Sequence, residues 1–393
     1  MKKKILIASY PLEAGGTTTS LLSLLNEIDY ERYDVDLLLL KKKGEFLDRV
    51  PKEVNILEQA LPVLPKIIDK LYKLLVFLIK GVFFKYVYYS VKNDNHHLIK
   101  FQILSTQGWG AVSRKLNMHY DTAIGFMEGW PDFYIAKKVN ADKKFAWVHV
   151  EYAKSGLDPR IDRGVFEKAD SIVLVSPFCK SSFDICFPEF ASKSVIMENI
   201  ISPNVIRKLA DEPVDFDTDP AALTLITVAR LRNEHKGLDR AVNALANLRR
   251  IGYNVKWYII GEGEDRQALE DAAANSGIED YFILLGGRKN PYPYIKKADA
   301  FVLPSRYEGK PMAVTEAQIL GIPVIATAYG SAHEQIEDNV NGLVVENNDG
   351  AIYDAIKKVL DKKVDLAVFA ENLKKGNFDN KDAVLKFYRL IDE

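Results

Sequence analysis

The feature of this sequence that most limits its fold is a repeated alternation of short apolar runs with helical segments. Such alternation is typical of βαβ units, in which parallel strands are joined by helices. The pattern occurs twice, once in each half of the chain, so each half is expected to form a parallel, doubly wound α/β domain. The expected strands are 4–9, 35–40, 54–57, 122–126, 144–150, 171–176 and 194–200 in the first half, and 223–229, 255–261, 281–286, 299–304, 321–327 and 342–346 in the second.

The segment 203–220 differs from both halves. It contains three prolines and five acidic residues, a composition typical of a polar linker. The chain has 393 residues, which suits two domains better than one. We therefore expect a first domain at 1–202, a linker at 203–220, a second domain at 221–376, and a C-terminal helix within 377–393 that packs back on the first domain.

The overall composition excludes several classes of protein. A net charge of −1 gives no global field for binding nucleic acid. Two cysteines, Cys179 and Cys186, do not form a disulfide framework and fit a reducing compartment. The start MKKKILIASYP is too short in its apolar part for a signal peptide, and no stretch is apolar enough to cross a bilayer. These features lead us to expect a cytoplasmic protein. The six histidines show no metal-ligand spacing, so we expect no metal site.

Polar and glycine-containing loops follow four consecutive strands of the second half. Arg230 and Lys236 follow 223–229, and further loops follow the next three strands at 261–263, 286–288 and 305–309. In open α/β sheets, ligands bind at the carboxyl ends of the strands, so these loops are expected to line one crevice.

The stretch SRYEGKPMAVTEAQILGIPVIAT (305–327) carries the most chemistry. Pro311 suits the first turn of a helix, and the amides of 309–312 would then form an anion site at its N-terminus. Glu316 interrupts an otherwise small and apolar helix, and a buried carboxylate that accepts from two vicinal hydroxyls would suit a ribose. Arg230 and Lys236 would neutralise a diphosphate. Alternatively, Glu308 is a helix cap, Glu316 belongs to a buried ion pair, and the two cations are solvated.

The sequence has neither a GxxxxGK[ST] loop nor a GxGxxG after its first strand, so a P-loop or dinucleotide site is not indicated. Five ordered blocks of 223–346 instead resemble family-4 retaining glycosyltransferases of the GT-B fold. These blocks are VARLRNEHKGLDRAV, IIGEGEDRQALE, LLGG, ADAFVLPSRYEGKPMAVTEAQILGIPVIAT and EDNVNGLVV. The resemblance implies two Rossmann-like domains that face a central cleft.

The resemblance also implies roles for residues of the second half. Arg230 and Lys236 would bind the donor's phosphates and assist the leaving group, Glu316 would hold the ribose hydroxyls, and Glu308 would contact the transferred sugar. The remaining donor-binding positions that it implies are Gly287, Arg288, Gly309, Lys310, Pro311 and Met312.

The first half resembles the family more loosely. Gly15 and Gly16 match its glycine loop. The alternative is that they form a turn without contacting a ligand. The stretch 121–152 resembles enzymes that build bacterial surface polysaccharides such as capsule and lipopolysaccharide. In it His149 matches a histidine near the reacting sugar, although a satisfied core histidine is an alternative. Glu128 and Glu151 are candidates for acceptor binding.

The resemblance therefore implies a retaining hexosyltransferase that uses a nucleotide-diphosphate sugar, with UDP favoured over GDP, and needs neither metal nor other cofactor. The acceptor would be a saccharide, and in particular a lipid-linked glycan precursor at the inner face of the membrane. Two other functions share this fold: a non-hydrolysing sugar-nucleotide epimerase and a non-catalytic partner subunit.

The segment 66–89, KIIDKLYKLLVFLIKGVFFKYVYY, predicts an amphipathic helix with lysines on one face. Lysines interrupt it too often for a membrane-spanning helix. Two interpretations stay open: a peripheral helix in a membrane interface with its lysines at anionic headgroups, or a core helix with a wet lysine face.

Overall fold

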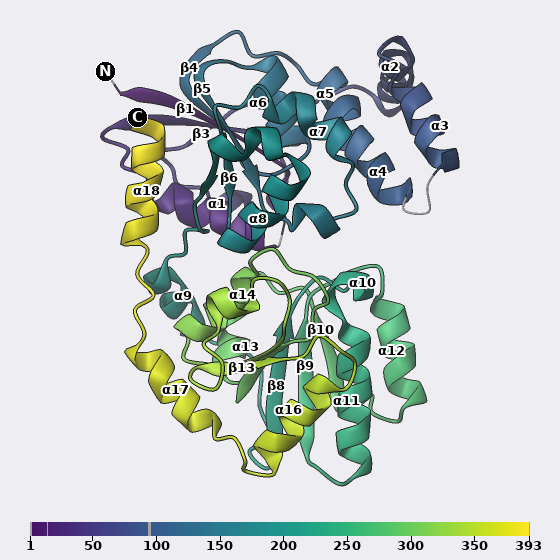
Figure 1. The fold of residues 1–393 in the computed structure, drawn as a ribbon, viewed down its shortest axis with the longest axis vertical. Coiled ribbons are helices and arrows are strands. Elements are labelled where there is room, and N and C mark those ends of the chain that lie inside the picture. The colour runs from purple at the N-terminus through teal and green to yellow at the C-terminus, as the bar shows by residue number, and fades with distance from the viewer. Residues whose placement is uncertain (1, 14, 93–95, 393) are drawn as a thin grey trace. The chain divides into compact units, whose positions relative to one another are not determined.

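The computed structural model describes residues 2–13, 15–92 and 96–392. Its contacts divide the chain into two compact units (Figure 1). The first unit contains the N-terminal strand, residues 17–200 and the C-terminal helix from Lys381 onward, and the second contains Ile201–Asn380 together with Gly15 and Gly16. The main division thus falls after Ile200 and Asn380, a few residues from the expected limits at 202 and 376.

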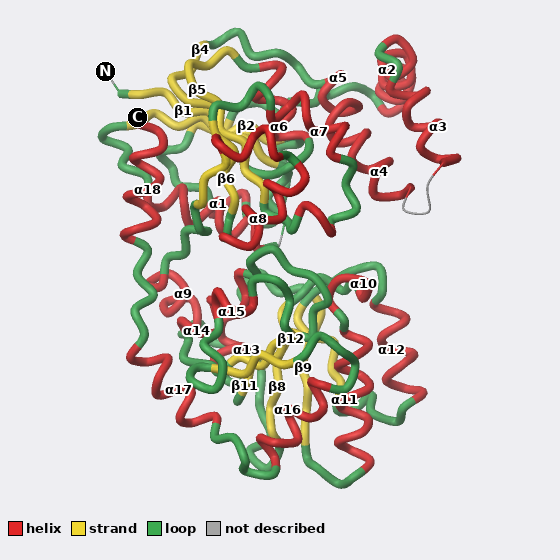
Figure 2. Tube along the Cα trace, viewed as in Figure 1, coloured by secondary structure: helices red, strands yellow, loops and turns green. Residues whose placement is uncertain are grey.

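The first unit is built on a seven-stranded sheet in the order β3-β2-β1-β4-β5-β6-β7, and every pairing is parallel. Figure 2 shows the strands of both units in yellow. Its strands are β1 Lys3–Ser9, β2 Tyr33–Leu39, β3 Asn55–Ile56, β4 His119–Gly125, β5 Asn140–Val148, β6 Ser171–Leu174 and β7 Ser194–Ile196. Its helices are α1 Gly16–Glu27, α2 Lys66–Ile79, α3 Val82–Lys92, α4 His96–Ile103, α5 Trp109–Val112, α6 Trp130–Lys138, α7 Pro159–Phe166, α8 Pro177–Cys186 and α18 Lys381–Asp392.

The second unit is built on a six-stranded parallel sheet in the order β10-β9-β8-β11-β12-β13. Its strands are β8 Leu223–Val228, β9 Val255–Ile260, β10 Phe282–Gly286, β11 Ala300–Leu303, β12 Val324–Thr327 and β13 Gly342–Val345. Its helices are α9 Pro203–Ala210, α10 Asn233–Lys236, α11 Leu238–Arg250, α12 Arg266–Asn275, α13 Tyr292–Lys296, α14 Met312–Ile319, α15 Ala332–Gln335, α16 Ala351–Leu360 and α17 Leu366–Lys375.

Apolar side chains cover both faces of each sheet, as parallel strands require. In β1, Ile5 and Ile7 join the core that contains α1, α8 and α18, whereas Leu6 and Ala8 point into the core beneath α6. The strands of the second unit divide their residues in the same way between α11 and α16 on one face and α9, α13 and α14 on the other. The predicted pair of parallel, doubly wound sheets is therefore confirmed.

The prediction of a linker at 203–220 is wrong. Residues Pro203–Ala210 form helix α9, which packs against α13 and α14. Ile206, Ala210 and Phe216 are buried in the core of the second unit. The prolines and acidic residues of this segment lie between these buried apolar residues. The polar average composition therefore suggested a linker, although the apolar residues form one buried face.

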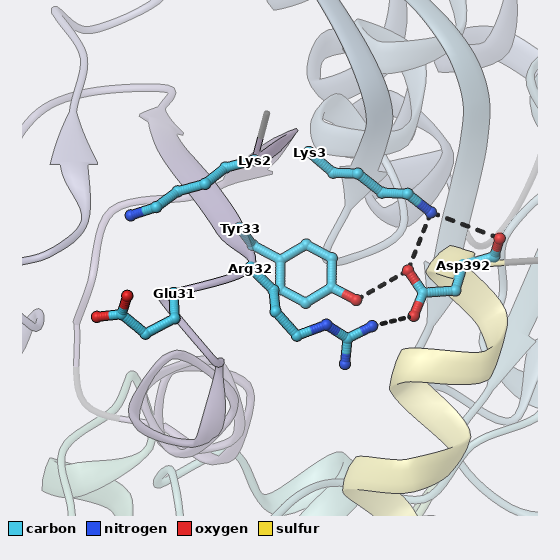
Figure 3. A pocket seen from close by; sticks show the side chains of 6 residues that line it. All are labelled: Lys2, Lys3, Glu31, Arg32, Tyr33 and Asp392. Carbon is cyan, nitrogen blue, oxygen red and sulfur yellow. Dashed lines mark hydrogen bonds and ion pairs between the residues drawn. The ribbon is translucent and has the colours of Figure 1, made fainter.

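The C-terminal helix α18 packs on the first unit through Phe387 and Ile391, which are buried in its main core. Asp392 fastens its end, as Figure 3 shows at the edge of a surface pocket. The Asp392 carboxylate accepts hydrogen bonds from Lys3 Nζ at 2.9 Å, Arg32 Nη2 at 2.6 Å and the Tyr33 hydroxyl at 2.8 Å. Since these donors belong to β1, β2 and the residue before β2, the helix end is tied to the sheet.

Candidate functional site

The second sheet reverses its strand order between β8 and β11, the neighbours at its centre. Chain connections leave these two strands in opposite directions, which opens a crevice at their carboxyl ends, the usual binding position in such sheets. Arg230 lies two residues beyond β8, and the loop Ser305–Glu308 follows β11. The topology therefore brings together the loops in which the sequence predicted phosphate- and sugar-binding residues.

Lys236 and Glu308 form an ion pair in this crevice. Lys236 Nζ lies 2.6 Å from Glu308 Oε1, and the side chains are 24% and 9% exposed. The hydroxyl of Ser305 donates to the same carboxylate oxygen at 2.6 Å. An ammonium group has three protons, so Lys236 retains donors for an anion beside Glu308. The pair thus places a cation with unused donors directly beside a fixed hydrogen-bond acceptor.

Glycine geometry explains how Lys236 reaches the end of β11. Gly237 adopts a left-handed conformation (φ +60°), and a Cβ there would lie 2.3 Å from the carbonyl oxygen of Pro304. Only glycine therefore allows this turn to touch the chain after β11. The contact is reinforced by Arg306, whose guanidinium donates to both carboxylate oxygens of Asp239 at 2.8 and 2.7 Å. The loops that carry Lys236 and Glu308 are consequently held together by backbone contact and by this bidentate pair.

Glu316 is buried in α14, with 5% of its surface exposed. The Tyr292 hydroxyl of α13 donates to Glu316 Oε1 at 3.1 Å. Burial raises the pKa of Glu316 to about 7, while the Tyr292 hydrogen bond opposes that shift. No cation pairs with this carboxylate among the described residues, which excludes the alternative of a buried ion pair. The site therefore holds a strong hydrogen-bond acceptor that ionises near neutral pH.

The N-terminus of α14 lies directly after Glu308. The helix begins at Met312, and Pro311 is the capping residue with an extended ψ of 118°, so its predicted place in the first turn is wrong by one position. Proline supplies no amide hydrogen, which leaves the amides that follow it as the first donors of the helix. Gly309 and Lys310 are half-buried between Glu308 and this cap.

Gly287 and Arg288 lie in an exposed loop after β10. The Gly287 amide donates to Glu262 Oε1 at 3.2 Å, and Arg288 Nε donates to the Tyr294 hydroxyl at 3.1 Å. The guanidinium of Arg288 also lies 5.7 Å from the centre of the Tyr294 ring. Arg230, in contrast, is exposed, and its guanidinium has no hydrogen bond or ion pair with any described residue.

Two residues of this site escaped the sequence analysis: Tyr292 and Tyr329. The hydroxyl of Tyr329 is buried without a hydrogen-bond partner among the described residues, and Glu308 contributes to the rise of its pKa. Ser305 belongs to the loop 305–309 that was expected to line the crevice, but its hydrogen bond to Glu308 was not predicted. Tyr292 and Tyr329 could not be found from the sequence, because each belongs to a segment that meets the crevice only in three dimensions.

The first unit gathers polar groups at the carboxyl end of β4 and β5. The backbone amide of His149 donates to Glu128 Oε2 at 2.9 Å. The imidazole lies against Phe126, with ring centres 5.4 Å apart, and its Nε2 is buried without a described partner. Burial lowers the pKa of His149 to about 4 and raises that of Glu128. His149 is therefore a neutral ring with an unused nitrogen, and not a fully satisfied core histidine.

The other candidates of the first unit lie nearby in sequence but differ in environment. Glu151 is 7% exposed and pairs with Lys154 Nζ at 3.0 Å. Gly15 precedes α1, and Gly16 is its first residue.

Sequence analysis missed Asp132, a fully buried residue of α6. Its pKa is raised well above its usual range by burial and by the neighbouring charge of Glu128. Among the described residues, no group of three or more His, Cys, Asp or Glu side chains could hold a metal ion.

Comparisons with known proteins agree with this arrangement. Residues 212–376 match the family model described as glycosyl transferases group 1. A glycosyltransferase of Methanocaldococcus jannaschii is 28% identical over 203 residues, covering 49% of this chain and 50% of that protein. The amylovoran biosynthesis glycosyltransferase AmsK of Erwinia amylovora is 34% identical over 164 residues, covering 38% of this chain and 40% of AmsK. The matched part thus spans half or less of these curated relatives.

Solved structures extend the similarity to the whole chain. Anabaena HepE in complex with UDP and glucose superposes with a TM-score of 0.70 at 15% identity and covers 99% of both chains. TarM of S. aureus, in a complex that contains UDP, gives a TM-score of 0.70 at 15% identity over 100% of both chains. At this identity the likeness establishes the fold. The chain has the GT-B fold of these glycosyltransferases, and its second unit is related in sequence to the glycosyl transferases of group 1.

Proposed function

We propose that this protein is a family-4 retaining glycosyltransferase that moves a sugar from a nucleoside diphosphate to a saccharide acceptor without a metal ion. The observation that supports this most strongly is the Lys236–Glu308 pair at the centre of the second sheet, followed at once by the N-terminus of α14. This combination offers positive charge to a diphosphate and a fixed carboxylate to a sugar hydroxyl.

In the proposed reaction, the bond between the anomeric carbon and the β-phosphate oxygen breaks first. Lys236, Arg230 and the amides of the first turn of α14 stabilise the charge that develops on the leaving diphosphate. The acceptor oxygen then bonds to the same face of the sugar, and its proton passes to the departing phosphate. Glu308 holds the transferred sugar, and Glu316 accepts hydrogen bonds from the ribose hydroxyls. Gly287 and Arg288 contact the base.

We assign acceptor binding to the first unit. His149 Nε2 is a buried nitrogen without a described partner, so it is suited to a hydrogen bond with a bound sugar hydroxyl. Glu128 and Glu151 are proposed to help orient the acceptor, and Gly15 and Gly16 to let the chain approach the substrates closely.

We favour a UDP-sugar as donor and a lipid-linked glycan precursor of a surface polysaccharide as acceptor. UDP is bound in the structures of HepE and TarM, although a GDP-mannose-dependent mannosyltransferase of Mycobacterium tuberculosis is also 27% identical over 237 residues. The relative AmsK takes part in amylovoran biosynthesis, and an Escherichia coli relative acts on a sugar diphosphoundecaprenol. Membrane contact through 66–89 would give access to such an acceptor.

The proposal is tested by incubating the full chain with UDP-sugars and GDP-sugars together with saccharide and lipid-linked saccharide acceptors, with and without added chelator, and analysing the products by mass spectrometry and NMR. We expect release of the nucleoside diphosphate, a glycoside with the anomeric configuration of the donor, and no effect of chelator. Conversion of the donor to its epimer would indicate the epimerase, and no turnover in any mixture would indicate the non-catalytic partner subunit.

A further inference from the structure

The first unit leaves a large apolar surface uncovered on α2. None of the residues of this helix is fully buried. Tyr72, Val76 and Phe77 are partly buried and attach the helix to the unit. The opposite face is apolar and exposed, with Leu71 at 63% and Ile79 at 71% exposure; it consists of Ile67, Ile68, Leu71, Leu74, Leu75, Leu78 and Ile79. At 3.6 residues per turn these seven side chains occupy an arc of about 140°.

This finding decides between the two interpretations of the segment 66–89. A core helix would bury its apolar arc and expose its lysines to solvent, but here the apolar arc is the exposed side. Lys73 is instead half-buried and pairs with Asp69 at 2.6 Å. The single helix expected from the sequence is also broken, because Gly81 adopts a left-handed conformation (φ +68°) between α2 and α3. The core-helix interpretation is therefore wrong.

Helix α3 continues the exposed surface with aromatic residues. Phe83, Phe84, Val87 and Tyr88 are 42%, 68%, 44% and 54% exposed. Together α2 and α3 supply half of the exposed large apolar side chains in the described chain, so the surface is a concentrated patch and not ordinary scatter. Figure 1 shows both helices in dark blue at the outer side of the first unit, away from its strands.

The charges around this patch identify its partner. Residues 66–92 contain six lysines and one acidic residue, Asp69, whereas the whole chain has a net charge of −1. Lys66 and Lys70 are exposed and adjoin one edge of the apolar arc. Protein interfaces are depleted in lysine at their cores, whereas an interfacial helix pairs an apolar face with lysines that reach anionic headgroups.

We propose that α2 and α3 form a membrane-binding surface that inserts its apolar side chains between the headgroups of a bilayer containing anionic phospholipid. Within the described residues, no helix is long and apolar enough to cross a membrane, so these helices would lie in the plane of the interface. The inference deepens the proposed function, because a lipid-linked acceptor is presented at such a surface. Lipid binding itself does not depend on which reaction the protein catalyses.

The test is flotation of the full chain with phosphatidylcholine vesicles that contain or lack phosphatidylglycerol. We expect binding to the anionic vesicles that weakens with salt. Leu75→Glu, at a 58% exposed position, is expected to weaken that binding by at least about tenfold. Leu385→Glu is the matched control, since Leu385 is a 52% exposed leucine on the docked helix α18, and it should bind as the wild type does.

A charge variant separates the lysine contribution from that of the apolar arc. Lys66→Glu combined with Lys70→Glu is expected to reduce binding to anionic vesicles about thirtyfold or more at low salt, since each lysine near such a surface contributes about 1 kcal/mol. Lys52→Glu, at another exposed lysine, should have no effect. Donor hydrolysis without vesicles should be unchanged in all variants, so loss of lipid binding is distinguishable from loss of enzyme activity.

Two outcomes would overturn the proposal. Failure of the wild type to float with anionic vesicles would show that the patch does not recognise lipid. A dimer that Leu75→Glu dissociates, measured by sedimentation together with absent vesicle binding, would assign the patch to a second copy of the chain.

Discussion

The two glutamates proposed to bind the donor and the buried His149 and Asp132 of the first unit differ in how far the protein itself supplies their partners, although the Tyr329 hydroxyl of the second unit is also buried without a described partner. In the second unit, the buried glutamates have partners within the protein: Lys236 and Ser305 bond to Glu308, and Tyr292 bonds to Glu316. In the first unit, the imidazole Nε2 of His149 is buried without a described partner, and Asp132 is buried where ionisation is disfavoured. Groups that protein hydrogen bonds hold in place are preorganised to bind a part of the ligand that does not vary. A buried polar group without a protein partner needs a hydrogen bond from the bound substrate.

This difference matches the division of labour that we propose. A nucleoside diphosphate is constant in every reaction cycle, so its binding groups can be fixed in advance. An acceptor varies between enzymes that share this fold, and its contacts are supplied by side chains outside the ordered motifs. The following predictions test that division, and they begin with the largest expected effect.

Lys236→Ala should cause the greatest loss. It removes a cation from the proposed leaving group and leaves Glu308 without its ion-pair partner. We expect transfer to fall by at least about a hundredfold, the usual size for loss of one group that stabilises developing charge. Steady-state kinetics measures the effect, with Lys375→Ala, an exposed lysine of the same unit, as control. Equal rates in both variants would show that Lys236 does not serve the reaction.

Glu316→Gln should change both nucleotide binding and the pH dependence of stability. Because the folded pKa of about 7 exceeds the ordinary value of 4.5, the folded state holds a proton that the unfolded state releases between these values. The wild type therefore loses about 3 kcal/mol of stability, relative to the variant, as pH rises through this window. Chemical denaturation at pH 5 and pH 8 measures the difference.

The same substitution tests the ribose assignment. The ionised carboxylate is the better acceptor, so wild-type affinity for UDP should increase up to about tenfold from pH 6 to pH 8 relative to Glu316→Gln. Titration calorimetry of both proteins at both pH values separates this effect from ionisation of the nucleotide. Parallel affinity curves would contradict a role for Glu316 in nucleotide binding.

His149→Gln should have the opposite pH signature. The folded pKa of about 4 lies below the ordinary value of 6.5, so the unfolded state takes up the extra proton in this window. The wild type should therefore lose about 3 kcal/mol relative to the variant as pH falls from 6.5 to 4. Transfer should fall about tenfold while affinity for UDP stays unchanged. Reduced UDP affinity in the variant would contradict the assignment of His149 to acceptor binding.

Tyr292→Phe should have the smallest effect. It deletes one hydroxyl that donates to Glu316 and leaves the buried ring in place. We expect UDP affinity to fall about fivefold, the value of one such hydrogen bond, and the pKa of Glu316 to rise further. Calorimetry at pH 7 measures the affinity, and an unchanged value would show that Tyr292 does not orient the carboxylate.

Sequence patterns predicted the fold well because buried parallel strands are continuous apolar runs. Every expected strand corresponds to one in the structure, and the C-terminal helix predicted within 377–393 is α18. The proximity of the loops that carry Lys236 and Glu308 was also expected, since both loops follow strand ends that converge, but their ion pair was not predicted.

The errors arose where local composition and tertiary packing disagree. The acidic, proline-rich segment 203–220 was expected to be a linker because its buried residues, such as Ile206 and Phe216, are sparse. Amphipathicity alone did not show which face of α2 is covered, since that depends on what α2 packs against. Tyr292 and Tyr329 could not be found because nothing in a single sequence indicates that their hydroxyls approach the two glutamates.

The most direct test of the central claim is a thermal-shift panel of UDP, GDP, ADP and CMP on the wild type and Glu316→Gln, with and without metal. A ligand at a hundred times its dissociation constant adds about 2.7 kcal/mol of stability. We predict a clear shift of the wild type with UDP, independent of metal and much reduced in Glu316→Gln. No shift with any nucleoside diphosphate, or equal shifts in both proteins, would contradict the proposed donor site.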